Sequence, residues 1–167
     1  GSIFAHVTHG VAAASGLLAL GLRAEAALGY SLGESTALLA LGAWPDRDGM
    51  WEATRASGLF ETELAGPCLR AEALWGSGDW AAALLLGHPI EVARAALVGT
   101  ARLLIVNTDT EVVVGGLRPD VEASAAALGL RPGWLRGVPS VHCELVDDLA
   151  EAWRSLHTRP TVPIAQR

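Results

Sequence analysis

The sequence predicts an α/β protein with a hydrolase-like core, built around a strand–turn–helix nucleophile elbow, and an inserted ferredoxin-like (βαββαβ) small subdomain. Two patterns predict this fold. Residues 29–33 read G-Y-S-L-G, the G-x-S-x-G pattern of such an elbow, between a short apolar run and a helical pattern. Residues 80–138 give strand and helix signals in the order βαββαβ. With 167 residues, 51% of them hydrophobic, the chain can bury a core of this kind.

Helical patterns dominate the chain before residue 79. In order, the sequence predicts a buried helix over residues 7–22, a buried strand over 26–30, a helix over 33–41 and a helix over 49–59. Asp46 and Asp48 precede the last of these helices and are good N-cap residues. Glycine and proline punctuate residues 67–78, so we expect a boundary there.

A regular alternation of strands and helices follows this boundary. Strands are predicted over residues 80–86, 103–106, 111–114 and 134–138, and helices over 89–97 and 119–128. A helix over 145–156 and an extended, proline-rich tail over 158–164 come after them. We therefore expect a small subdomain at residues 79–138, inserted into a large subdomain made of residues 3–78 and 139–167.

Composition argues against several classes of protein. The net charge is −6, all twelve basic residues are arginines, and no basic run occurs, which argues against nucleic acid as a partner. No apolar run reaches the roughly 18 residues of a membrane span without a charge or a break. Cys68 and Cys143 have neither a disulfide framework nor metal-ligand spacing, so we expect a reduced, cytoplasmic protein without a metal site. Because the chain lacks an initiating methionine, we expect it to be a piece of a longer protein.

Ser31 is the candidate nucleophile, because it stands at the centre of the G-x-S-x-G pattern. In an elbow its hydroxyl points outward at the start of the following helix. There the backbone N–H of Leu32 and the helix dipole can stabilise an oxyanion. The alternative interpretation is a glycine-rich turn in which Ser31 caps the helix.

A serine nucleophile needs a base, and histidine is the usual one. The chain contains five histidines: His6, His9, His88, His142 and His157. His142 is the candidate base, since it follows the small subdomain at a junction between loop and helix. The alternative is a packed or capping histidine.

Three segments resemble one enzyme family. Residues 29–34, G-Y-S-L-G-E, resemble the G-H-S-x-G-E signature of malonyl-CoA:acyl carrier protein transacylases and of the acyltransferase domains of polyketide and fatty acid synthases. Residues 107–116 resemble the family's N-S-x-x-Q-x-V-[IV]-x-G strand pair, and residues 138–145 resemble the segment around its catalytic histidine. All three occur in family order, although Tyr30 replaces the usual histidine before the nucleophile.

The resemblance implies a ping-pong acyltransferase. Ser31 would attack the thioester of an acyl-CoA while His142 accepts its proton, and the phosphopantetheine thiol of an acyl carrier protein would then take the acyl group. The implied partners are acyl-CoA, an acyl carrier protein and neighbouring synthase domains, with no bound cofactor and no metal. The two-part large subdomain would be part of the acyltransferase core. The family's G-Q-G-x-Q loop, which supplies a second oxyanion donor, would precede Ile3.

Two further residues gain roles from the resemblance. Arg55 lies 24 residues after Ser31, where the family places an arginine that binds the free carboxylate of malonyl-type units; the alternative is a surface arginine. Asn107 either lines the cleft or caps a strand turn.

Residues 51–67 resemble the acyltransferase regions of polyunsaturated fatty acid synthases. Two other functions stay open: a serine thioesterase or esterase, and a truncated, non-catalytic structural domain.

Overall fold

The computed structural model describes residues 2–164 and divides into two compact units. The described part of unit 1 comprises residues 2–54 and 155–164, and unit 2 is Arg55–Arg154. The subdomain limits expected at 78/79 and 138/139 fall inside unit 2 and stay a prediction. None of the described helices has the length and apolar character that crossing a membrane requires.

Two helices make the core of unit 1. α1 (Ser2–Ala19) packs against α2 (Leu32–Ala40), so the helices predicted over residues 7–22 and 33–41 are present with shifted ends. Gly10 permits a close approach, because a Cβ atom there would lie 2.5 Å from Cγ2 of Thr36. The buried core residues are Val7, Leu39 and Trp44.

The strand predicted over residues 26–30 is wrong, because these residues form no regular element. Leu28 is 92% exposed and Tyr30 is 59% exposed. A strand needs a neighbour with which to share its backbone hydrogen bonds, and the described part of unit 1 contains no strand. Residues 26–30 are therefore apolar enough for a buried strand, but the described part of unit 1 offers no second strand with which they could pair.

Short helices lead from unit 1 into unit 2. α3 (Arg47–Ser57) is followed by a turn of π-helix, η1 (Leu59–Glu63), and by α4 (Leu69–Trp75). The predicted boundary at residues 67–78 therefore contains a helix. In place of one helix over 145–156, the chain forms a 3-10 helix, η2 (Glu144–Leu149), and then α7 (Ala150–His157). The fully buried leucines of this part are Leu59, Leu64 and Leu145.

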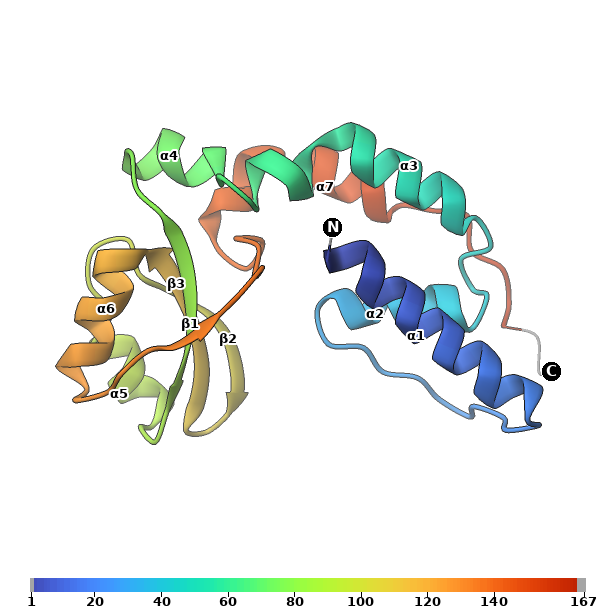
Figure 1. Ribbon diagram of the computed structural model, residues 1–167, viewed down its shortest axis with the longest axis horizontal. Helices are drawn as coiled ribbons and strands as arrows, with labels where there is room; N and C mark the ends of the chain where they lie inside the picture. Colours follow the sequence, from blue (N-terminus) through green and yellow to red (C-terminus); the bar gives the residue numbers. More distant parts are fainter. Residues whose placement is uncertain (1, 165–167) are drawn as a thin grey trace. The chain divides into compact units, whose positions relative to one another are not determined.

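A four-stranded antiparallel sheet forms the rest of unit 2 (Figure 1). Its elements follow in the predicted order: β1 (Trp80–Leu86), α5 (Ile90–Ala95), β2 (Arg102–Thr108), β3 (Glu111–Leu117), α6 (Arg118–Ala127) and β4 (Gly133–Leu135). The strand order is β2-β3-β1-β4, so β1 and β3 are the two central strands. Consecutive side chains of a strand point to opposite faces, which gives the sheet two apolar faces.

The two faces of the sheet have different covers. On one face Ala83, Leu85, Val112 and Val114 pack against α5 and α6, which Figure 1 shows together on one side of the sheet. On the other face Ala82, Leu104 and Val113 are buried. The residues packed against this second cluster include Val138 and Cys143. The chain that carries His142 therefore runs along the face that the helices leave uncovered.

Candidate active site

Ser31 has a strained backbone at the N-terminal end of α2. Its φ is 51° and its ψ is −118°, a combination that non-glycine residues rarely adopt. The turn is closed by two backbone hydrogen bonds, from Gly33 N to Tyr30 O (2.9 Å) and from Glu34 N to Ser31 O (3.0 Å). Strain of this kind persists where the surrounding structure enforces it, and it is concentrated at functional sites.

Only the first glycine of the G-x-S-x-G pattern is required by packing. A Cβ atom on Gly29 would lie 2.1 Å from the backbone nitrogen of Glu34, whereas a Cβ on Gly33 would meet nothing within 4 Å. Residue 29 must therefore be glycine for the chain to turn this sharply into α2. The steric demand explains why the pattern begins with glycine.

Ser31 does not act as a helix cap. Its side chain is exposed and makes no capping hydrogen bond to the described first turn of α2. Leu32 is the first residue of α2, so its backbone N–H is one of those that a helix leaves without an intrahelical acceptor. A donor in this position, at the positive end of the helix dipole, can stabilise an oxyanion.

An open groove of about 480 Å³ runs beside this turn within unit 1. Leu28, Tyr30 and Leu32 line it from the turn, and His6 and Thr36 line it from α1 and α2. Tyr30, the residue that departs from the family signature, is therefore part of the groove wall.

His142 is exposed and lies in a short segment of unit 2 that is anchored before and after it. The indole Nε1 of Trp80 donates to the carbonyl oxygen of Val138 (2.9 Å). Ser140 is fully buried and donates to the carbonyl oxygen of Leu64 twice, from its backbone nitrogen (2.7 Å) and from its hydroxyl (3.2 Å). These contacts fix the backbone that leads into His142.

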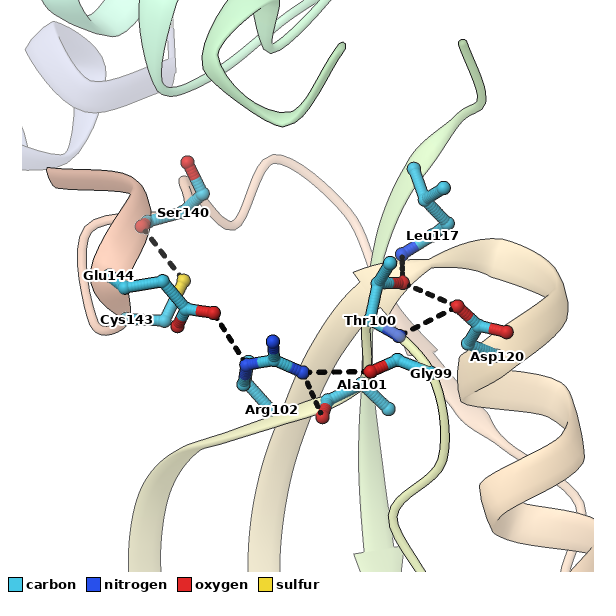
Figure 2. A network of polar contacts seen from close by, with 9 residues as sticks. All are labelled: Gly99, Thr100, Ala101, Arg102, Leu117, Asp120, Ser140, Cys143 and Glu144. Carbon is cyan, nitrogen blue, oxygen red and sulfur yellow. Dashed lines mark hydrogen bonds and ion pairs between the residues drawn. The ribbon is translucent and has the colours of Figure 1, made fainter. Parts of the chain in front are cut away.

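A network of polar contacts continues from this segment onto the sheet (Figure 2). Glu144 pairs with Arg102 at the start of β2, with Oε1 and Nε 2.6 Å apart. Thr100 donates to Asp120 from its backbone nitrogen (2.8 Å) and from its hydroxyl (2.6 Å). Both hydrogen bonds lower the pKa of Asp120, and the one from the hydroxyl contributes most. Sequence reasoning missed the Arg102–Glu144 pair, because residues that far apart in sequence carry no spacing signal.

Cys143 is the neighbour of His142, and the structure makes it a poor nucleophile. Its Sγ lies 3.5 Å from the carbonyl oxygen of Ser140. Burial raises the pKa of the Cys143 thiol to about 11. Because the thiolate is the reactive species, Cys143 is protonated and unreactive near neutral pH.

This pKa predicts slow alkylation of Cys143. At pH 8 we expect iodoacetamide to modify it about a hundredfold more slowly than a free thiol with an ordinary pKa of about 8.5, because the thiolate fraction is smaller by that order. The rate should rise about tenfold for each pH unit between pH 8 and 9.5. Mass spectrometry of the labelled peptides measures the rate, and a Cys143→Ser variant identifies the signal. Labelling at pH 8 as fast as that of glutathione would contradict the prediction.

Arg55 and Asn107 both lie on unit 2. Arg55 is exposed in the last turn of α3, and it forms no ion pair with any residue of the described range 2–164. Asn107 is near the end of β2, where its amide donates to Oε1 of Glu111 across the β2–β3 turn (2.7 Å).

The candidate residues are divided between the two units. Ser31 and Leu32 belong to unit 1, and Arg55, Asn107 and His142 belong to unit 2. Their convergence on one site is therefore a prediction from the sequence and not a contact within either unit. Across residues 2–164, no group of three His, Cys, Asp or Glu side chains could hold a metal ion.

Several solved structures that are similar to this chain are acyltransferases. The acyltransferase domain of the iterative polyketide synthase in enediyne biosynthesis is 28% identical, with a TM-score of 0.65, and the match covers 96% of this chain and 41% of that one. A malonyl-CoA:acyl carrier protein transacylase from Xanthomonas oryzae pv. oryzae is 27% identical, with a TM-score of 0.65 and coverages of 93% and 50%. A malonyl-transacylase in complex with a type II polyketide synthase acyl carrier protein is 21% identical, with a TM-score of 0.67 and coverages of 93% and 50%.

These matches confirm the resemblance noted in the sequence. The α/β fold of this chain is similar to that of malonyl-CoA:acyl carrier protein transacylases and of polyketide synthase acyltransferase domains. The chain spans half or less of the length of the three structures described above. No protein-family model and no curated protein matches it.

Proposed function

We propose that this chain carries the acyl-transfer site of an acyltransferase of the malonyl-CoA:acyl carrier protein transacylase type, working within a fatty acid or polyketide synthase. The observation that carries the proposal is the backbone of Ser31, a serine held at positive φ directly before a helix. A strained turn of this kind is what a nucleophile elbow requires. The similar solved structures support the same activity, since their names describe malonyl transacylases and acyltransferase domains.

The reaction has two half-reactions. In the first, Oγ of Ser31 attacks the thioester carbon of malonyl-CoA, and His142 accepts the hydroxyl proton. The backbone N–H of Leu32 stabilises the oxyanion of the tetrahedral intermediate. When this intermediate collapses, the carbon–sulfur bond breaks. CoA then leaves with the proton from His142. In the second half-reaction the phosphopantetheine thiol of an acyl carrier protein gives its proton to His142 and attacks the acyl carbon of the acyl-serine. The bond between that carbon and Oγ of Ser31 then breaks, and His142 returns the proton to Oγ, which restores the free hydroxyl.

Substrate choice is assigned to Arg55 in this proposal. A guanidinium binds a carboxylate through two parallel hydrogen bonds, so it favours a malonyl unit over an acetyl unit. Asn107 is a second candidate for the cleft. No metal or bound cofactor takes part, because the acyl group arrives on CoA and leaves on the carrier protein.

The finer assignments of fold and setting are also part of the proposal. Residues 79–138 form the ferredoxin-like small subdomain, and residues 3–78 and 139–167 form part of the large acyltransferase subdomain. The antiparallel order β2-β3-β1-β4, with α5 and α6 on one face, supports the first assignment. The proposed setting is a cytoplasmic synthase, of the polyketide or the polyunsaturated fatty acid type, with neighbouring synthase domains as partners.

Acylation by malonyl-CoA tests the proposed function. We expect the purified protein to gain the mass of one malonyl group, with the modified peptide containing Ser31, and to lose that mass when a carrier protein bearing phosphopantetheine is added. Intact-mass and peptide mass spectrometry measure both steps. Loss of the acyl group to water at the same rate with and without the carrier protein would favour a thioesterase or esterase. Absence of any adduct would favour a structural, non-catalytic domain.

A further inference from the structure

One arginine that the proposed mechanism does not use is fixed on several sides in unit 2. The guanidinium of Arg102 donates from Nε to Glu144 (2.6 Å) and from a terminal nitrogen to the carbonyl oxygens of Gly99 (3.0 Å) and Ala101 (3.1 Å) (Figure 2). Its central carbon also lies 5.3 Å from the ring centroid of Trp75. An arginine fork held by several acceptors and one aromatic face has little freedom left, so its position is well defined.

The backbone beneath this arginine is equally well fixed. Arg102 begins β2 and pairs with Gly115 of the central strand β3. Just before it, Thr100 is bonded to Asp120 on α6, and its hydroxyl accepts a hydrogen bond from Leu117 N (2.9 Å). The carboxylate of Glu144 is therefore tied, through Arg102, to the hydrogen-bonded sheet of unit 2.

His142 lies midway between two anchors. Ser140, two residues before it, is fully buried and bonded to the carbonyl oxygen of Leu64. Glu144, two residues after it, is bonded to Arg102. With both anchors in place, the backbone of His142 can move only as far as a few intervening dihedral angles allow. Loss of the second anchor would leave the histidine fixed from one side only.

We propose that Arg102 and Glu144 are positioning residues for His142. Their ion pair ties the segment that carries His142 to the sheet and so keeps the histidine in place. The inference rests on the proposed function, because it matters for catalysis only if His142 is the base. An isolated surface ion pair contributes little, because the geometry of its side chains is loosely held. This pair differs, because its side chains are only 35% and 40% exposed and the arginine has further partners.

Three variants and a control pair test the positioning role. Arg102→Met keeps the length of the side chain and removes the ion pair, Glu144→Gln is isosteric, and Arg102→Lys keeps the charge but loses the fork. The control removes the exposed Arg94–Glu91 pair on α5, where Nε and Oε2 are 3.9 Å apart, by Arg94→Met and Glu91→Gln.

The kinetic readout separates positioning from binding. In single-turnover acylation at saturating malonyl-CoA, we expect the rate constant to fall about ten- to a hundredfold in Arg102→Met and in Glu144→Gln, as small displacements of a reacting group do. A double variant that combines Arg102→Met with Glu144→Gln should be no slower than either single variant, since both substitutions remove the same contact. The half-saturating concentration of malonyl-CoA should stay within about twofold. Arg102→Lys should fall between the native protein and Arg102→Met, and the control variants should match the native protein.

Hydrogen exchange gives a readout that needs no activity. In the Arg102 and Glu144 variants we expect faster amide exchange in the peptide containing residues 141–146, with the β1 and β3 peptides unchanged. If the native protein forms no acyl-enzyme, the proposed function fails, and faster exchange in the variants still demonstrates the anchor. Unchanged exchange and unchanged acylation in Glu144→Gln would overturn the inference. So would a rate loss accompanied by faster exchange throughout the sheet, which would indicate a purely structural role.

Discussion

Replacing Ser31 by alanine is expected to abolish the acyl-enzyme, because the acyl group has no oxygen to bond to. Replacing His142 by alanine is expected to lower the rate of acylation by about three to four orders of magnitude, and the double variant should behave like Ser31→Ala. The two side chains act on one proton in one step. Without the histidine the hydroxyl keeps its proton, and without the serine the base has no proton to accept. Effects of residues that act as a unit are strongly non-additive.

Rapid-quench measurement of the acyl-enzyme checks this prediction in the two single variants and the double variant. Ser15→Ala and His9→Ala are matched controls, because both residues are exposed on α1 and His9 lies close to its own helix, with Nδ1 2.7 Å from the carbonyl oxygen of Ala5. The controls should retain the native rate. A Ser31→Ala protein that still accumulates malonyl adduct would show that the nucleophile lies elsewhere. Cys143 is a poor substitute, because its thiol stays protonated at the pH of the assay.

Sequence patterns located three of the four strands of unit 2 well, whereas the strand predicted over residues 134–138 is reduced to the short β4, Gly133–Leu135. β1 occupies residues 80–86, as predicted, since a short apolar run between glycine-rich turns can be buried on both faces only in the centre of a sheet. β2 and β3 extend beyond their predicted ends. Register and strand order depend on pairing between distant segments, which local patterns do not encode.

The failures have an equally physical origin. The apolar run at residues 26–30 was predicted as a strand from composition, but a strand is a property of two segments, and the described part of unit 1 provides no second one. α4 was missed because Pro67 and Gly76 flank it closely and hide a helix of only seven residues. Its cap residue Cys68 has a φ of 52°, a conformation that nothing in the sequence signals.

In the candidate site, too, local sequence patterns indicate some residues, whereas contacts between distant segments could not be predicted. The pattern that makes Ser31 the candidate nucleophile is local in sequence, because the turn before it requires a glycine at position 29. The anchors around His142 could not be predicted, since Ser140, Arg102 and Glu144 meet only when the sheet and the short helices have formed. Short motifs in the sequence nominate candidate catalytic residues, whereas contacts between distant segments, such as Arg102 with Glu144, are visible only in the folded structure.

Arg55→Ala is expected to lower kcat/KM for malonyl-CoA by about a hundredfold and to leave kcat/KM for acetyl-CoA nearly unchanged. A charge-assisted, bidentate pair with a carboxylate stabilises a complex by roughly 1.5–3 kcal/mol, and an acetyl group offers nothing for it to bind. The surroundings of Arg55 favour this role. Arg47 on the same helix pairs with Asp48, with Nε and Oδ1 3.1 Å apart, whereas Arg55 has no carboxylate partner among residues 2–164.

Arg47→Ala is the matched control for this substitution, because it removes an exposed arginine from the same helix and should leave the selectivity unchanged. Steady-state transfer to a carrier protein, with malonyl-CoA and acetyl-CoA as competing substrates, measures the ratio directly. An Arg55→Lys variant should recover part of the preference, since it restores the charge without the fork. If Arg55→Ala keeps the full preference for malonyl-CoA, the carboxylate is bound elsewhere. If the native protein shows no preference, a serine hydrolase that is indifferent to the acyl group becomes the better account of Ser31.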